Sequence, residues 1–212
     1  MPSRRHILGH ALAGAAGLAA AALPGPAAAQ SRDNPMPESL RKALERDPTA
    51  PVLGNPRGDV TLTEFFDYNC GFCRRMVPTI QRLIGADPQL RVVFREWPVF
   101  GEGSDFTARA ALASLEQGKY WQFHAALMGL RGTADEASTL RVAREVGLDE
   151  ARLRRDMDSA RVEDHIAASF ALGEHMGLMG TPSFIAGDEA LFGQQTLAGM
   201  QALVARARVT LG

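Results

Sequence analysis

The sequence predicts an α/β domain that is interrupted by a helical insertion. Three observations support this fold class. Residues 60–96 show strand, helix and strand patterns in turn, residues 104–178 show almost only helical patterns, and residues 183–208 show two strands and a helix. A strand–helix–strand unit of this length favours a right-handed parallel crossover. We therefore expect the first and third stretches to build one sheet, with the helical block inserted between them.

The first strand is defined by its alternation. Residues 60–66 place Glu64 on the same face as the apolar Phe66, because successive strand residues point to opposite faces of a sheet. A helix is expected to follow from the cysteines to about residue 84, and Leu90–Glu96 is the second predicted strand.

The insertion consists of helical segments separated by glycine or aspartate residues. Serine is a residue type that caps helices, and we expect Ser104 to begin a helix that ends at Gly118. The other expected elements are helices at 120–130, 136–146, 150–157 and 162–176, strands at 183–186 and 190–192, and a closing helix at 196–208.

Residues 1–29 have the three parts of an export signal. Arg4 and Arg5 precede an apolar run that ends at Leu23, and the small residues at 27–29 suit a cleavage site. The paired arginines favour the twin-arginine (Tat) route over the Sec route. An uncleaved membrane anchor is the alternative, but the run of about 16 residues is shorter than the roughly 20 that a span needs. We expect a cleaved signal and a periplasmic, oxidising location.

Removal of this signal would leave 183 residues, enough for one domain with a sizeable core. We expect an N-terminal arm at 30–58, the first part of the α/β domain at 59–103, the helical insertion at 104–178 and the second part at 179–212. Hydrophobic residues make up 46% of the chain and charged residues 22%, which excludes wholesale disorder. The net charge of −1 excludes a globally basic nucleic-acid binder.

The chain has two cysteines, Cys70 and Cys73, so neither a framework of several disulfides nor a zinc site of four thiolates can form within it. Two sulfurs spaced three residues apart on a helix share one face and lie within reach of a disulfide. The helix N-terminus favours the thiolate of Cys70, and the thiolate is the species that attacks in disulfide exchange. We assign Cys70 as the nucleophile and Cys73 as the resolving thiol.

A Cys-x-x-Cys pair can also be half of a zinc site or an inert structural disulfide. Zinc needs two further ligands, and the histidines beyond the signal, His124, His165 and His175, lack the spacing of such a site. The pattern therefore favours redox chemistry with no metal and no cofactor. Arg74 and Arg75 follow the pair, where they could support the thiolate, meet acidic partners or simply lie in solvent.

Glu64 lies on the strand face that the apolar pattern buries. Burial of a carboxylate is costly and should raise its pKa. A carboxylate poised in this way could accept the proton of Cys73 when that thiol resolves a mixed disulfide. The alternative is a charge near the strand end that reaches solvent.

Several motifs resemble those of the DsbA family of thiol-disulfide oxidoreductases. They are Thr63–Cys73, Arg95–Pro98 and Gly180–Phe184, and the resemblance extends over roughly residues 50–208. Within the family the sequence is most similar to the exported Com1-like subgroup, which carries Cys-Gly-aromatic-Cys. The resemblance implies a thioredoxin fold with an inserted all-helical domain, and it implies that Glu64 is the buried acid of the site.

The resemblance also implies a cis peptide between Thr181 and Pro182 that faces Cys70 and offers the Thr181 backbone to an extended substrate segment. DsbA itself has a histidine between its cysteines, where this chain has Gly71 and Phe72. Phenylalanine carries no positive charge, so the thiolate should be less stabilised and the protein a milder oxidant. Thr181 stands where DsbA has an apolar residue, and in this respect the chain resembles the isomerase and reductase members of the family.

The function that follows is oxidation of cysteine pairs in periplasmic or secreted proteins. A disulfide isomerase or reductase linked to metal stress is one alternative, and a carrier of Cu(I) or zinc is another, since thiolates suit Cu(I). We expect exported cysteine-containing substrates, a membrane redox partner and no nucleic acid. We also expect a monomer, because the arm at 30–58 is shorter than the stalk of trimeric isomerase relatives.

Overall fold

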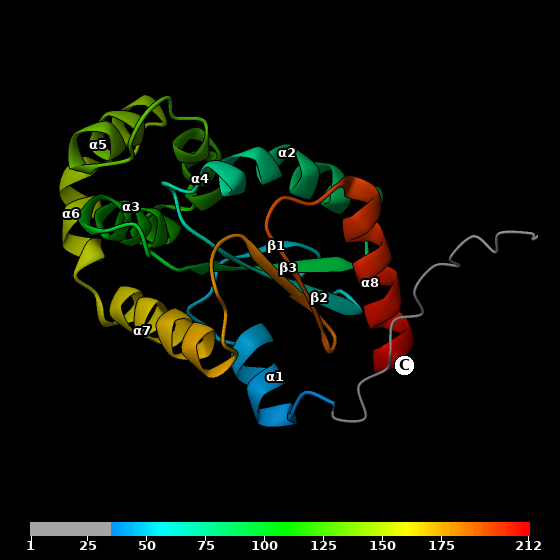
Figure 1. Cartoon of the computed structure of the whole chain (residues 1–212). Coiled ribbons are helices and arrows are strands. Elements are labelled where there is room, and N and C mark those ends of the chain that lie inside the picture. The colour runs from blue at the N-terminus through cyan, green and yellow to red at the C-terminus, as the bar shows by residue number, and fades with distance from the viewer. Residues whose placement is uncertain (1–34) are drawn as a thin grey trace, which may run out of the picture. The chain divides into compact units, whose positions relative to one another are not determined.

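The computed structural model describes residues 35–212, which form a five-stranded mixed sheet with helices on both faces (Figure 1). The predicted export signal and the first residues of the predicted arm lie outside the described part. In chain order the elements are α1 (Glu38–Glu45), β1 (Val52–Gly54), β2 (Val60–Phe66), α2 (Gly71–Ala86), β3 (Leu90–Glu96), α3 (Glu102–Ala113), the 3₁₀ turn η1 (Ser114–Gln117), α4 (Tyr120–Met128), α5 (Glu136–Glu145), α6 (Glu150–Met157), α7 (Ala160–His175), β4 (Ser183–Ala186), β5 (Glu189–Phe192) and α8 (Leu197–Leu211).

The strands lie in the order β1-β3-β2-β4-β5. β2 and β3 are parallel, with Val60 opposite Leu90 and Phe66 opposite Glu96, and the other neighbouring pairs are antiparallel. The helices α3 to α7 come between β3 and β4 in the chain. The predicted α/β class with a helical insertion is therefore confirmed.

The alternation of β2 sorts its side chains between two cores. Leu62 and Phe66 belong to the large core with residues of α2 and α8, whereas Phe65 belongs to a second cluster with residues of α1 and α7. Figure 1 shows these two pairs of helices on opposite sides of the sheet. Glu64 is an even-numbered position of the same strand, so its side chain points toward the α2 side.

One strand of the sheet was not predicted. Residues 30–58, predicted as an N-terminal arm, contain β1, which pairs antiparallel with β3 and places Val52 opposite Val93. At Gly54 the backbone has a φ of 72°, and a Cβ atom there would clash with the Leu90 carbonyl oxygen, so the strand ends at a residue that must be glycine. The same segment contains the helix α1.

The helix expected to begin at Ser104 begins instead at Glu102. The Ser104 hydroxyl is used elsewhere, since it donates to Asp67 Oδ1 at 2.7 Å and accepts a hydrogen bond from Asn69 Nδ2 at 2.9 Å. The α-helix ends at Ala113 and continues as the 3₁₀ turn η1, which stops at the predicted Gly118, where a φ of 66° favours glycine.

Other helices begin at residues whose side chains accept backbone hydrogen bonds. Asp135 caps α5, Asp149 caps α6 and Thr196 caps α8, in each case by accepting from the N–H group three residues on. Among residues 35–212, no helix combines the length and the apolar character needed to cross a bilayer.

A buried ion pair attaches the insertion to the sheet. Glu96 at the end of β3 places Oε2 2.8 Å from His165 Nε2 of α7, and its Oε1 accepts a hydrogen bond from the Tyr120 hydroxyl of α4 at 2.6 Å. All three side chains are buried. Burial opposes ionisation of Glu96, but its bonds with His165 and Tyr120 prevail and lower the pKa of this carboxyl.

Replacement of Glu96 by alanine is expected to lower the free energy of unfolding by about 3–5 kcal/mol, because it leaves His165 and Tyr120 without their partner in the core. Denaturant titration measures this loss. Glu145→Ala, which removes an exposed pair with Arg141 on α5, should cost under about 1 kcal/mol. Folding lowers the pKa of Glu96, so this residue contributes to the free energy of unfolding at pH values above its pKa in the unfolded state. The contribution is lost as the pH falls through its pKa in the folded state. Equal losses for the two variants would contradict this account.

Candidate active site

The turn between β2 and α2 is held by two polar side chains. Asp67 accepts hydrogen bonds from the N–H groups of Asn69 and Phe100, at 2.6 and 3.1 Å. The Asn69 side chain donates to the Ala134 carbonyl oxygen at 2.9 Å and accepts from the Ala134 N–H group at 2.7 Å. Segments of the insertion and of the loop after β3 therefore fix the backbone directly before Cys70. This role of Asp67 and Asn69 was not predicted, although aspartate and asparagine between a strand and a helix are typical turn residues.

Cys70 occupies the N-cap of α2, as the sequence predicts. Its sulfur accepts a hydrogen bond from the Cys73 N–H group at 3.2 Å, and its thiol donates to the Thr181 carbonyl oxygen at 3.3 Å. Both cysteines are free thiols in the structure. The start of α2 and the loop before β4 therefore both supply hydrogen-bond partners to one sulfur atom.

The surroundings of Cys70 favour its thiolate. A hydrogen bond from the Cys73 side chain contributes most and, although burial opposes ionisation, the pKa of Cys70 falls to about 6. The Thr181 side chain and the N–H groups of Cys73 and Phe72 lower this pKa further. Thr181 Oγ1 is buried and has no other hydrogen-bond partner in residues 35–212, so its hydroxyl is free to turn toward the thiolate. At neutral pH most Cys70 is therefore ionised.

Cys73 has the opposite character. It is fully buried, and burial raises its pKa far above that of a free thiol. Donation of its S–H to Cys70 and the nearby charge of Glu64 raise this pKa further. The pair is thus asymmetric, with a stable thiolate at position 70 and a thiol at position 73 that cannot ionise without a proton acceptor.

Glu64 is buried on β2, where its register partners are Phe94 on β3 and Phe184 on β4. Burial, followed by the negative charge of Cys70, raises the pKa of Glu64 to about 8. The alternative of a charge that reaches solvent is wrong. Glu64 is protonated in most molecules at neutral pH and is coupled to both sulfurs, which suits a proton carrier.

The peptide between Thr181 and Pro182 is cis, and the Thr181 carbonyl faces Cys70, as the resemblance implies. Neighbouring backbone holds this loop in place. The Pro182 carbonyl oxygen accepts a hydrogen bond from the Gly193 N–H group at 2.8 Å, and the Ser183 hydroxyl donates to the Gly180 carbonyl oxygen at 2.6 Å.

The two arginines after the dithiol have different roles. Arg74 is structural, since Nε donates to the Tyr68 carbonyl oxygen at 2.8 Å and Nη1 donates to the Gly132 carbonyl oxygen at 2.7 Å. Arg75 lies over the ring of Phe72, 4.5 Å from its centroid. The groups that lower the pKa of Cys70 most include neither arginine, so the structure does not support the alternative in which they stabilise the thiolate.

Phe72 is 52% exposed between the cysteines and leaves room for a charged residue. Phe72→His is expected to lower the pKa of Cys70 and to raise the reduction potential by some tens of millivolts, where about 30 mV corresponds to about 1.4 kcal/mol. The physical reason is the positive charge that a protonated histidine adds beside the thiolate. Thiolate absorbance against pH and a glutathione titration measure the two quantities. Phe72→Leu is the neutral control, and a histidine variant that matched it would contradict the expected tuning.

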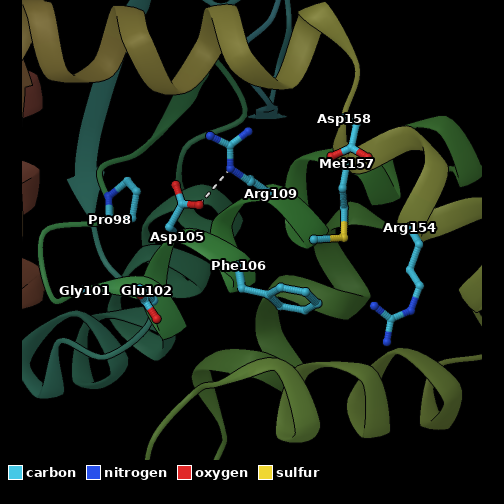
Figure 2. Close-up of a pocket in the computed structure, with 9 residues that line it drawn as sticks. All are labelled: Pro98, Gly101, Glu102, Asp105, Phe106, Arg109, Arg154, Met157 and Asp158. Atoms are coloured by element: carbon cyan, nitrogen blue, oxygen red, sulfur yellow. Dashed lines mark hydrogen bonds and ion pairs between the residues drawn. The ribbon is translucent and has the colours of Figure 1, made fainter.

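A separate cavity of about 580 Å³ lies between the start of α3 and α6 (Figure 2). Figure 2 shows Asp105 and Arg109 on its wall, joined by an ion pair at 2.8 Å. None of the predicted redox residues lines it. Within the part of the chain that the structure describes, no three His, Cys, Asp or Glu side chains gather closely enough to hold a metal ion.

The fold and the dithiol at the start of α2 define the class of this protein, a thiol-disulfide oxidoreductase. Residues 61–205 match the family described as the DSBA-like thioredoxin domain, and the chain belongs to this family. The fold is accordingly a thioredoxin fold with an inserted helical domain, as predicted.

Three solved structures are similar to this chain. A thioredoxin-like oxidoreductase from Silicibacter pomeroyi DSS-3 shares 56% identity with a TM-score of 0.78, covering 80% of this chain and 98% of that one. The thiol-disulfide exchange protein alpha-DsbA2 from Wolbachia pipientis shares 29% identity with a TM-score of 0.74, covering 79% and 91%. A periplasmic thioredoxin-like protein from Salmonella enterica serovar Typhimurium shares 26% identity with a TM-score of 0.74, covering 82% and 98%.

Curated relatives include much longer proteins. The Na(+)/H(+) antiporter NhaA 3 of Salinispora tropica is 27% identical over 161 residues, which is 74% of this chain and 25% of that protein. An antiporter NhaA 1 of Salinispora arenicola is also 27% identical and is covered to the same 25%. The chain thus spans about a quarter of the length of these relatives, and the similarity concerns one part of them.

Proposed function

We propose that this protein oxidises pairs of cysteines in exported proteins by transferring a disulfide held between Cys70 and Cys73. The observation that carries the proposal is the asymmetry of the pair. Cys70 has a pKa of about 6, whereas the pKa of Cys73 is raised by burial. A stable thiolate is a good leaving group, so it favours the reduced enzyme and makes the disulfide form an oxidant.

The transfer would proceed in two exchanges. A substrate thiolate attacks Cys70 Sγ of the enzyme disulfide, a mixed disulfide forms, and Cys73 leaves as a thiolate that takes up a proton. The second substrate thiolate then attacks the substrate sulfur of the mixed disulfide and releases the Cys70 thiolate. The substrate loses two electrons and the enzyme gains them, so the reduced enzyme must be reoxidised by another protein.

Glu64 supplies the proton in this scheme. With a pKa of about 8 it holds a proton at neutral pH, and it can donate that proton to the leaving Cys73. In the reverse direction its carboxylate accepts the proton from Cys73. The Thr181 carbonyl beside Cys70 would meanwhile accept a backbone hydrogen bond from the extended substrate segment.

The proposal includes a periplasmic location reached through the predicted Tat-like export signal. Support comes from the sequence of residues 1–29 and from the similarity to a periplasmic thioredoxin-like protein. We further propose exported cysteine-containing proteins as substrates, a membrane protein as the partner that reoxidises the dithiol, and a monomer as the working form.

Thr181 favours a second candidate, a disulfide isomerase. Its side chain lowers the pKa of Cys70. With a threonine before the cis proline, the chain also resembles the isomerase members of the family. An isomerase uses the reduced dithiol to attack wrong disulfides, and not the disulfide form to oxidise thiols.

The two candidates differ in which redox form is active. The oxidised protein is mixed with a reduced, unfolded two-cysteine polypeptide, and the reduced protein is mixed with the same polypeptide scrambled. We expect the oxidised form to transfer its disulfide stoichiometrically within seconds to minutes. Activity confined to the reduced form would contradict the oxidase and support the isomerase.

A further inference from the structure

The guanidinium of Arg75 is held over the two residues between the cysteines. It stacks on Phe72 at 4.5 Å, and its Nε donates to Gln194 Oε1 at 2.7 Å. A Cβ atom built on Gly71 would lie 3.6 Å from Nη1. Two contacts from different segments, α2 and the loop after β5, therefore fix an exposed cation at the rim of the dithiol.

The two terminal nitrogens of this guanidinium have no polar partner in the described part of the chain. In residues 35–212, neither Nη1 nor Nη2 of Arg75 forms a hydrogen bond or an ion pair, although most other arginines of the fold pair with carboxylates or carbonyls. An arginine that is already oriented loses little entropy when a planar carboxylate binds its two terminal nitrogens. The two terminal nitrogens of this oriented side chain can thus donate hydrogen bonds to a carboxylate that binds near Cys70.

We propose that Arg75 is a specificity-determining residue, which binds an acidic side chain close to the reacting cysteine of a substrate polypeptide. The inference rests on the proposed function and adds a substrate class to it, acidic peptide segments. Phe72 and Gln194 act as positioning residues. Each contacts Arg75 and orients its guanidinium, and neither needs to carry a charge or to react with sulfur.

Arg75 would act on substrate binding and not on the ionisation of Cys70. Arg75 is not among the main groups that stabilise the Cys70 thiolate. Its effect should therefore fall on the KM for charged substrates and weaken as salt screens the pair. For an exposed charge pair the expected preference is roughly two- to fivefold.

The test uses three reduced two-cysteine peptides that differ at one residue next to the first cysteine, which is Glu, Gln or Lys. The oxidised full-length mature protein is compared with its Arg75→Gln and Arg75→Lys variants. Arg82→Gln is the matched control, because Arg82 is also exposed on α2 and forms no ion pair within residues 35–212. The Glu, Gln or Lys residue also changes the reactivity of the peptide thiol next to it. This change is the same for every protein variant, so it cancels when the variants are compared on the same peptides.

We expect the ratio of kcat/KM for the Glu peptide over the Gln peptide to fall roughly two- to fivefold in Arg75→Gln. Arg75→Lys should restore part of it, Arg82→Gln should leave it unchanged, and high salt should remove the difference. An unchanged ratio in Arg75→Gln, with transfer to all three peptides intact, overturns the assignment of Arg75 alone. Failure of the wild-type protein to oxidise any peptide contradicts the proposed function, and this inference with it.

Discussion

Cys73→Ser should convert the protein into a trap for its partners. In the reduced variant, the Cys70 thiolate still attacks a partner disulfide, forms a mixed disulfide and releases the other partner sulfur. A serine hydroxyl at position 73 cannot then attack and release the complex, because an alcohol is far less ionised and less nucleophilic than a thiol. We expect covalent complexes with exported proteins on non-reducing gels, and their loss on reduction.

The controls of this experiment decide the roles of the two cysteines. Cys70→Ser should form no complexes and should lose disulfide transfer to the background level, because the remaining thiol is buried and its pKa is raised. The unmodified protein should form them only transiently. Complexes with Cys70→Ser and none with Cys73→Ser would mean that the assignment of nucleophile and resolving thiol is reversed.

Glu64→Gln should have two effects of opposite sign. The amide cannot carry the Cys73 proton, so exchange should slow by about a hundredfold, the lower end of the range for general acid–base catalysis. The amide also needs no proton to stay neutral in the core, so the variant should unfold at higher denaturant concentration than the parent near neutral pH.

The stability effect has a defined pH dependence. Folding raises the pKa of Glu64 from 4.5 to about 8, so the native state keeps a proton that the unfolded state loses. Stability from this group is complete below pH 4.5 and declines as pH rises to about 8. At pH 7 the shift corresponds to about 3 kcal/mol, which Glu64→Gln should recover.

Unfolding titrations of both proteins at pH 4 and pH 7 measure this difference. The gap should be near zero at pH 4 and largest at pH 7, and exposed Glu145→Gln should show no gap at either pH. A gap that did not change with pH would show that Glu64 is ionised in the native core. A pH–rate profile unchanged by Glu64→Gln would remove this residue from the mechanism.

The parts of the fold that local pattern determines were predictable. Two-residue alternation identified β2 and placed Glu64 on its apolar face, while the resemblance to the DsbA family implied that Glu64 is buried. Capping and glycine residues placed most helices within a few residues of their observed ends. The position of Cys70 at a helix N-terminus followed from the strand before it and the helix after it. These features depend on residues close together in the chain.

The features that were missed depend on residues far apart. The three-residue strand β1 has little pattern of its own and is defined by its pairing with β3. Ser104 has the residue type of a cap, but Asp67 and Asn69, more than 30 positions away, use its hydroxyl. The ion pair of Glu96 with His165 joins positions 69 apart on elements that meet only in the folded chain. Tertiary contacts override local preference at each of these places.

The reduction potential of the Cys70–Cys73 pair tests the central claim most directly. A strong oxidant of this fold has a potential near −120 mV and thioredoxin near −270 mV. The stabilised Cys70 thiolate places this protein toward the oxidant, and the neutral Phe72 in place of a cation makes it milder. Equilibration with glutathione should therefore give a value between about −140 and −220 mV. A value below about −250 mV, in the range of thioredoxin, would contradict the oxidase and favour a reductase.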